Sequence, residues 1–290
     1  MASAAANLAR PGERVLVASC GHFGNRWAAI CRDHGLDVLH LEGEWGHPID
    51  PGAVADALAA EPGIGVVFVT QSETSTGAVS DLPALRAAAG DRILVADAVS
   101  GLGVVDLPMD RWGIGFVAAN ARAIARSAEL GPGGFYLDWE RTRKGQNASP
   151  PRTAFTPPVT LVCQLQAALE LMEREGLQNV FERHRVLGRM CRAGVVAAGL
   201  ELLGPENPEA NVVTSFLVPD GVDGKAIPTL MRDRFGIQIA GGQGRLSGKI
   251  CRFGHCGYYD YRDIITAVGA LELVLLELGR PVELGAGEIL

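Results

Sequence analysis

The chain has 290 residues, of which 48% are apolar and 20% charged, a composition typical of a globular protein. Its formal net charge of −7 argues against a surface that binds nucleic acid or an anionic membrane. The most apolar stretch, residues 264–278, contains two glutamates and is too short to cross a bilayer. The first ten residues lack the features of a secretory signal, and the six cysteines form no C-x-x-C pair. We therefore expect a soluble cytoplasmic protein with reduced thiols and no metal site.

The first part of the chain alternates short apolar runs with amphipathic segments. Apolar runs typical of buried strands occupy residues 14–20, 37–41, 65–70 and 92–97. Helical patterns lie between them, at residues 23–34, 51–60 and 81–89. Asp50 and Pro51 form a typical helix start. Strands that alternate with helices in this way predict an α/β fold with a mostly parallel sheet covered on both faces.

Beyond residue 113 the pattern is looser. Residues 116–119 and 134–137 have the composition of two further strands, on either side of a helix at 121–130. Residues 139–158 are rich in Arg, Pro, Ser and Asn and are expected to form a loop.

The last part of the chain predicts a second, smaller α/β region. Two long helices, over residues 159–175 and 177–198, lead into it. Its strands are expected at 211–218 and 249–253, and its helices at 224–235 and 261–278. We place the boundary between a large and a small domain near residue 165.

Polar loops follow the predicted parallel strands at their carboxyl ends, where open α/β sheets bind ligands. The loop at residues 71–77 is rich in hydroxyl groups, and Asp97 ends an apolar strand. A buried carboxylate at a strand end needs a cation or several hydrogen-bond donors. The protonated pyridine nitrogen of pyridoxal phosphate would be such a cation, and an ion-paired or helix-capping aspartate without a ligand is the alternative.

Six sequence blocks occur in an order typical of one enzyme family. They are Phe23-Gly-Asn-Arg-Trp27, Glu44-Trp-Gly46, Ser72-Glu-Thr-Ser-Thr-Gly77, Asp97-Ala-Val-Ser100 with Asp110-Arg-Trp-Gly-Ile114, Phe155-Thr-Pro-Pro158 and Arg252-Phe-Gly-His-Cys-Gly257. In this order they resemble the class V aminotransferases of the alanine–glyoxylate and serine–glyoxylate type, over nearly the whole chain. The resemblance implies a fold-type I protein, with a large cofactor-type domain at residues 1–165, shortened at its N-terminus, and a small C-terminal domain at 166–290.

The resemblance also implies roles for five residues. Asp97 corresponds to the carboxylate that pairs with the pyridine nitrogen, and Val99 to a residue that packs on the ring. Thr74 corresponds to the hydroxyl residue beside the cofactor, and Thr156 to one that reaches the phosphate in the neighbouring subunit. Arg252 corresponds to the arginine that binds the substrate carboxylate, a task that its planar fork suits. The family thus implies small amino or 2-oxo acids as ligands, and a homodimer or a heterodimer with a full-length relative.

The clearest departure from the family pattern concerns its Schiff-base lysine. At the corresponding place this chain has Ala119-Asn-Ala-Arg-Ala123. Ala123 occupies the lysine position without a gap, and Arg122 occupies it with a shift of one residue. Neither side chain forms an aldimine with pyridoxal phosphate.

Two further departures concern the cofactor phosphate. The family has a small-residue turn that holds the phosphate before the point where this chain begins, and Ala154 stands where relatives usually have a tyrosine. Pyridoxal phosphate is therefore implied by the resemblance and opposed by the residues that should hold it.

Three functions are compatible with these residues. We favour a pseudoenzyme that has lost transamination and acts as a partner, regulatory or ligand-binding subunit, because nucleophile and phosphate turn are lost together. The second is an enzyme that uses the inherited pocket for different chemistry on a small amino or 2-oxo acid. The third is a transaminase with a displaced lysine such as Lys144.

Overall fold

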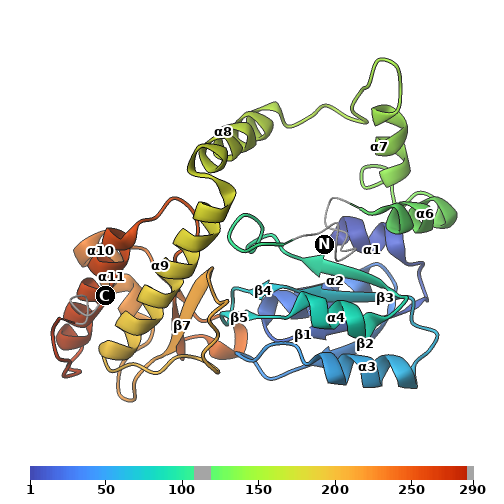
Figure 1. Cartoon of the computed structure of the whole chain (residues 1–290). Coiled ribbons are helices and arrows are strands. Elements are labelled where there is room, and N and C mark those ends of the chain that lie inside the picture. Colours follow the sequence, from blue (N-terminus) through green and yellow to red (C-terminus); the bar gives the residue numbers. More distant parts are fainter. Residues whose placement is uncertain (108–118, 286–290) are drawn as a thin grey trace.

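The computed structural model describes residues 1–107 and 119–285. Its first half is built on a four-stranded sheet in the order β2-β1-β3-β6 (Figure 1). The strands are β1 (Arg14–Ser19), β2 (Asp37–Glu42), β3 (Val66–Thr70) and β6 (Ile93–Asp97). All pairings in this sheet are parallel, as the apolar runs predicted.

Alternate residues of these strands face two helical layers. One face packs on α1 (Ala2–Leu8), α2 (His22–Asp33) and α6 (Ala121–Leu130), and the other on α3 (Pro51–Ala60) and α4 (Leu82–Ala89). In β1, for example, Val17 lies in the first core and Leu16 in the second. Successive side chains of a strand point to opposite faces of the sheet, so a strand covered on both sides must be apolar throughout.

Polar side chains fix where the covering helices begin. The Asp50 carboxylate accepts a hydrogen bond from the backbone N–H of Gly52 at 2.8 Å, with Pro51 in the first turn of α3. Asp81 caps α4 through the N–H of Ala84 at 3.0 Å. Each carboxylate satisfies an N–H group that has no partner inside its own helix. The helix start expected at Asp50 is therefore confirmed.

The second half contains a three-stranded antiparallel sheet in the order β7-β9-β8. Its strands are β7 (Val213–Leu217), β8 (Ala240–Gly241) and β9 (Ile250–Gly254), with a 3₁₀ turn at Gly244–Leu246. The helices α9 (Leu177–Ala197), α10 (Ala226–Phe235) and α11 (Tyr261–Glu277) share a separate core with this sheet, which includes Leu187, Phe216 and Leu271. The boundary near residue 165 stays a prediction.

The helix α8 (Val159–Glu175) buries none of its residues. It lies at the top of Figure 1, between the segment that carries α7 (Trp139–Gln146) and the start of α9. Its leucines at 161, 165 and 169 are all exposed. A helix that carries exposed leucines on three turns has apolar surface that this single chain leaves uncovered.

Two elements expected between residues 119 and 158 are wrong. Residues 134–137 form no strand, and 135–137 form a turn, because Gly134 has a φ of 113° and a strand requires a negative φ. Residues 139–146 form α7 instead of a loop. Asp138 caps this helix by accepting from the N–H of Glu140 at 2.9 Å, and the Trp139 indole donates to the Ser3 hydroxyl at 2.7 Å.

Part of one predicted strand and part of one motif lie outside the described residues. These are residues 116–118 of the strand and the block from Asp110 to Ile114. Within the described ranges, no helix is long and apolar enough to cross a membrane.

Candidate functional site

A buried carboxylate, Glu73, organises the carboxyl edge of the parallel sheet. It lies in a short hairpin of β4 (Ser72–Glu73) and β5 (Ala78–Val79) that follows β3. Its Oε2 accepts from the backbone N–H of Gly24 at 2.7 Å and its Oε1 from that of Phe23 at 3.2 Å. The backbone N–H and the hydroxyl of Ser75 add bonds of 3.2 and 2.5 Å. These donors compensate for the loss of water around a residue that is 0% exposed.

Gly21 allows the hairpin to approach α2 this closely. A Cβ on Gly21 would lie 2.4 Å from the Glu73 Cγ and 2.6 Å from the Ser75 hydroxyl. The carboxylate therefore sits directly at the N-terminus of α2, where the helix dipole favours a negative charge.

Arg252 joins the second half of the chain to this hairpin. From β9 its Nε and Nη2 donate to the Gly241 carbonyl at 3.0 and 2.8 Å, and its Nη1 donates to the Thr74 carbonyl at 2.5 Å. Burial lowers the pKa of the Arg252 guanidinium, and the nearby Glu73 charge acts in the opposite direction. The structure thus brings together two predicted site residues, Thr74 and Arg252. Three of the five N–H groups of an arginine are used in these bonds.

Asp97 ends β6 opposite Thr70 of β3, at the carboxyl edge where we expected it. Its Oδ1 accepts from the backbone N–H of Val99 at 3.1 Å, and its carbonyl accepts from the N–H of Gln71 at 2.9 Å. The Asp97 side chain is half-buried and the Val99 side chain is exposed. Both side chains are thus accessible to a ligand at this edge, and their predicted roles stay predictions.

The segment expected to carry the lysine lies elsewhere. Ala123, on α6, is 3% exposed and packs into the core that includes Leu8 and Val95. Asn120 caps the same helix by accepting from the Ala123 N–H at 2.9 Å. Arg122 is exposed, and it lines a small pocket with residues 92–95, at the beginning of β6. Asp97 is at the other end of that strand.

Thr156 and the three lysines are also outside this cluster. Thr156 is exposed in the segment between α7 and α8, and no bond of the described residues joins it to Asp97 or Arg252. Lys144 lies on α7 with a side chain that is 73% exposed, 4.0 Å from Glu140. Lys225 and Lys249 are exposed residues of the second half.

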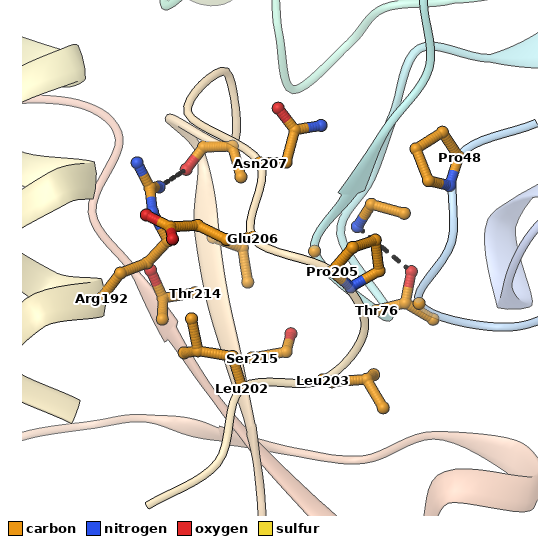
Figure 2. Close-up of a pocket in the computed structure, with 15 residues that line it drawn as sticks. Pro48, Thr76, Arg192, Leu202, Leu203, Pro205, Glu206, Asn207, Thr214 and Ser215 are labelled. Carbon is orange, nitrogen blue, oxygen red and sulfur yellow. Dashed lines mark hydrogen bonds between the residues drawn. The ribbon is translucent and has the colours of Figure 1, made fainter. Parts of the chain in front are cut away.

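Figure 2 shows a pocket between the turn of the β4–β5 hairpin and β7, which Thr76, Arg192 and Ser215 help to line. Gly77 has a φ of 86°, and a Cβ there would lie 3.2 Å from the Ser215 hydroxyl of β7. The Thr76 hydroxyl accepts from the Ala78 N–H at 3.3 Å across the turn. Arg192 on the far side donates to the Ala210 carbonyl at 2.6 Å. The absence of a side chain at Gly77 lets the hairpin lie close to β7.

Sequence reasoning missed Glu73 as a functional position. The residue was part of a hydroxyl-rich loop, and its role depends on backbone N–H groups 49 and 50 positions earlier in the chain. The available signal was an acidic residue three positions after a buried strand and two positions before Ser75. The structure also shows no group of three His, Cys, Asp or Glu side chains placed to hold a metal ion, within the ranges it describes.

Residues 1–255 match the family model described as Aminotransferase class-V. The chain belongs to the class V aminotransferase family. It is 38% identical to the soluble hydrogenase small subunit of Synechococcus sp. (strain PCC 6716), over 94% of this chain and 76% of that protein. It is 33% identical to the L-aspartate–glyoxylate aminotransferase of Paracoccus denitrificans, over 98% of this chain and 78% of that protein.

Among solved structures, the chain is similar to the ureidoglycine–glyoxylate aminotransferase of Bacillus subtilis. The TM-score is 0.91 at 28% identity, over 99% of this chain and 79% of that chain. The family and the fold-type I α/β architecture predicted from the six sequence blocks are therefore confirmed.

Proposed function

We propose that this class V family member no longer catalyses transamination and acts as a partner, regulatory or ligand-binding subunit. One observation supports the proposal: Ala123, which the resemblance places at the Schiff-base lysine position, is packed into the core of the first half. Transamination by pyridoxal phosphate requires an amine that binds the cofactor covalently and then transfers a proton. Neither the Ala123 methyl group nor the exposed Arg122 guanidinium supplies it.

The chain's own lysines do not replace this amine. Lys144, Lys225 and Lys249 are all exposed, whereas Asp97 and Thr74 lie half-buried at the carboxyl edge of the sheet. A transaminase with a displaced lysine would require Lys144 to leave α7 and its neighbour Glu140. We therefore rank the hypothesis of a displaced lysine below the other two.

The residues fit one part of pyridoxal phosphate and not the rest. Asp97 suits a protonated pyridine nitrogen, which makes the ring an electron sink when the cofactor is bound. The N-terminus of α2 is already occupied by the Glu73 carboxylate, so it offers no cradle for a phosphate. We expect that the cofactor, where it binds at all, is held noncovalently by Asp97, Val99 and Thr74.

The pocket residues that persist favour ligand binding. Arg252 and Thr74 are joined across the two halves, and the arginine keeps N–H groups beyond those that the Gly241 and Thr74 carbonyls use. A planar guanidinium at this place suits the carboxylate of a small amino or 2-oxo acid. The same pocket would also serve the second hypothesis, an enzyme with different chemistry on a small amino or 2-oxo acid.

We further propose that the chain works as a homodimer, or as a heterodimer with a full-length relative, in the cytoplasm. The exposed leucines of α8 provide apolar surface for a second chain. A relative named as the small subunit of a soluble hydrogenase supports a role within an assembly. In such an assembly, Thr156 would serve the pocket of the neighbouring chain.

The loss of transamination is tested with pyridoxal phosphate, borohydride and peptide mapping. We expect no reduced phosphopyridoxyl group at any lysine under stoichiometric cofactor, and no alanine–glyoxylate exchange. A serine–glyoxylate aminotransferase serves as the positive comparison. A reduced adduct on Lys144 together with measurable turnover would overturn the proposal and establish the displaced lysine.

Ligand binding is tested separately by titration calorimetry with glyoxylate. We expect Arg252→Gln to weaken binding by about tenfold or more, because the carboxylate loses its charged fork. Arg232→Gln removes the same charge from an exposed position and should leave binding unchanged. Equal affinity in the two variants would show that Arg252 does not hold the ligand.

A further inference from the structure

The two halves of the chain have separate cores and meet at polar contacts. The first half buries its apolar residues around the parallel sheet and the second half around the antiparallel sheet, while α8 between them buries none (Figure 1). Three side chains of the second half reach the first, namely Arg252, Arg245 and Asn207. Relative motion is the default behaviour of units whose cores are separate. The bonds of these three side chains therefore help to set how firmly the halves are held together.

Arg252 is covered, although it is the residue proposed to bind a carboxylate. The whole residue is 9% exposed. The Gly241 carbonyl accepts from both Nε and Nη2, which form one of the edges that a guanidinium offers to a carboxylate, and the Thr74 carbonyl accepts from Nη1. Two backbone carbonyls thus take the place of carboxylate oxygens. A ligand as large as glyoxylate needs one of the covering segments to move.

The segment around Thr74 is the one that can move without loss of sheet structure. Gly241 pairs with Cys251 of β9, and the next N–H along, that of Gly242, donates to the Ile250 carbonyl at 3.0 Å. Moving Gly241 away from Arg252 would therefore break the β8–β9 pairing. Thr74 belongs to the other half, and every strand pairing that the structure describes lies within one half. Separation of the halves thus removes the Thr74 carbonyl from Arg252 and leaves both sheets intact.

The Glu73 carboxylate also favours binding after separation. Its charge acts on Arg252 and opposes the lowering of the arginine pKa by burial. An anion that approached Arg252 in this arrangement would be repelled by the same charge. Because the N–H groups of Phe23 and Gly24 hold Glu73 on α2, the carboxylate stays with the first half when the halves separate. Arg252 then loses its negative neighbour and can bind the carboxylate of a ligand.

We propose that the bond between Arg252 and the Thr74 carbonyl is a latch between the two halves, which a carboxylate ligand releases. A carboxylate forms stronger, charge-assisted bonds to a guanidinium than a backbone carbonyl does, so it replaces the Thr74 carbonyl on Nη1. The halves then separate at the β4–β5 hairpin, and ligand binding is coupled to this opening. The latch presupposes the proposed ligand site at Arg252 and controls access to it.

Arg245 offers a way to loosen the junction without changing Arg252. Its Nη1 lies 3.5 Å from the Glu42 carboxylate, and its guanidinium carbon lies 4.2 Å from the centre of the Trp45 ring. Arg245→Gln removes this attraction and should increase the fraction of open chains. A ligand that binds only the open form then binds more tightly, so we expect the dissociation constant of glyoxylate to fall by about three- to fivefold in titration calorimetry. The lost positive charge would by itself weaken the binding of an anion, so tighter binding identifies the opening as the cause.

Arg262→Gln is the matched control. Arg262 pairs with Asp260, and its guanidinium carbon lies 5.7 Å from the centre of the Tyr261 ring, so both contacts are within the second half. Its removal should leave the affinity for glyoxylate unchanged. Unchanged or weaker binding in Arg245→Gln overturns the latch, and so does equal tightening in the two variants. No binding in the wild type or in either variant refutes the proposed ligand site, and the latch with it.

The movement itself is measured by double electron–electron resonance between two spin labels. Ala60→Cys on α3 and Asp233→Cys on α10 provide exposed attachment sites in the two halves, once the exposed Cys163 is replaced by serine. Glyoxylate should lengthen the distance between these labels. A second pair within the first half, Ala60→Cys with Asp91→Cys, should show no change. If calorimetry shows that glyoxylate saturates the chain while the distance between the halves stays the same or shortens, the latch is overturned and the ligand site stands.

Discussion

The helices α8 and α11 are both 17 residues long, yet α8 buries no residue while α11 buries seven. Both contain several leucines and valines, so composition alone does not separate them. The helix α11 packs against α9 and α10, whereas α8 contacts α9 near its own end. The difference shows that a helix of this chain is buried only where other elements pack against it, and that its own apolar residues are not sufficient.

A matched pair of leucine truncations should separate the two helices most strongly. Leu271 on α11 is fully buried, so Leu271→Ala should lower the free energy of unfolding by about 3–5 kcal/mol through lost burial and a new cavity. Leu169→Ala on the exposed α8 should change it by less than about 0.5 kcal/mol. Urea denaturation at high dilution, where chains are separate, measures both values. Similar losses in the two variants would mean that α8 is covered within one chain.

The pH dependence of stability tests the burial of His255, which follows β9 and whose Nε2 lies 2.9 Å from the Thr214 hydroxyl of β7. Burial lowers the pKa of His255 from 6.5 to about 3. The unfolded chain therefore binds the proton more readily, and stability is lost as the pH falls from 6.5 towards 3. At pH 4.5 this loss amounts to about 2–3 kcal/mol. The His255→Gln variant lacks this term, so its free energy of unfolding should fall less between pH 7 and pH 4.5. Parallel pH profiles for the two proteins would contradict the assignment.

Charges on α8 should weaken the assembly without unfolding the chain. Leu165 and Leu169 are four residues apart and lie on one face of the helix. Replacing both with glutamate should destabilise the proposed dimer by about 2 kcal/mol, or roughly a thirtyfold rise in its dissociation constant. Light scattering over a dilution series measures this shift. The exposed residues Leu273 and Leu276 of α11 provide the control, since the same replacement there should leave the assembly intact.

Changes at the helix caps of α8 and α11 should have the smallest effect on the free energy of unfolding. Asp260 and Asp263 form a capping box at the start of α11, so Asp260→Ala should cost about 1 kcal/mol. The helix α8 begins after Pro158 with no side-chain cap. Pro158→Asp should therefore stabilise it by a few tenths of a kcal/mol, which thermal unfolding resolves as a small rise in Tm. A loss on Pro158→Asp would show that the proline itself fixes the path of the chain.

Elements that depend on local sequence were predictable. The run at residues 14–20 matches β1, and the helix at 121–130 matches α6, because apolar periodicity and a capping residue are both local signals. The helix α7 was missed because its Trp139 is fixed by Ser3, a contact between residues 136 positions apart. The strands β4 and β5 have two residues each, which is too few to show an apolar periodicity in the sequence.

The candidate site was also predictable only in part, because several of its contacts join residues that are far apart in the sequence. The place of Asp97 follows from the rule that parallel strands end at one edge, so the sequence sufficed. The bond between Arg252 and the Thr74 carbonyl joins residues 178 positions apart, and the resemblance named both residues without indicating that they touch. The burial of Ala123 depends on α1 and β6 and has no signature in its own segment.

The β4–β5 hairpin makes hydrogen bonds to α2 and to Arg252, and these two contacts close loops of very different length. Glu73 reaches α2 across about 50 residues, whereas Thr74 reaches Arg252 across 178. The entropy of closing a loop grows with its length, and contacts between distant residues slow folding. The sheet and its hairpin can therefore assemble while the second half is still unfolded. Arg252 is synthesised near the end of the second half, so the bond that joins it to the Thr74 carbonyl is among the last contacts of the hairpin to form.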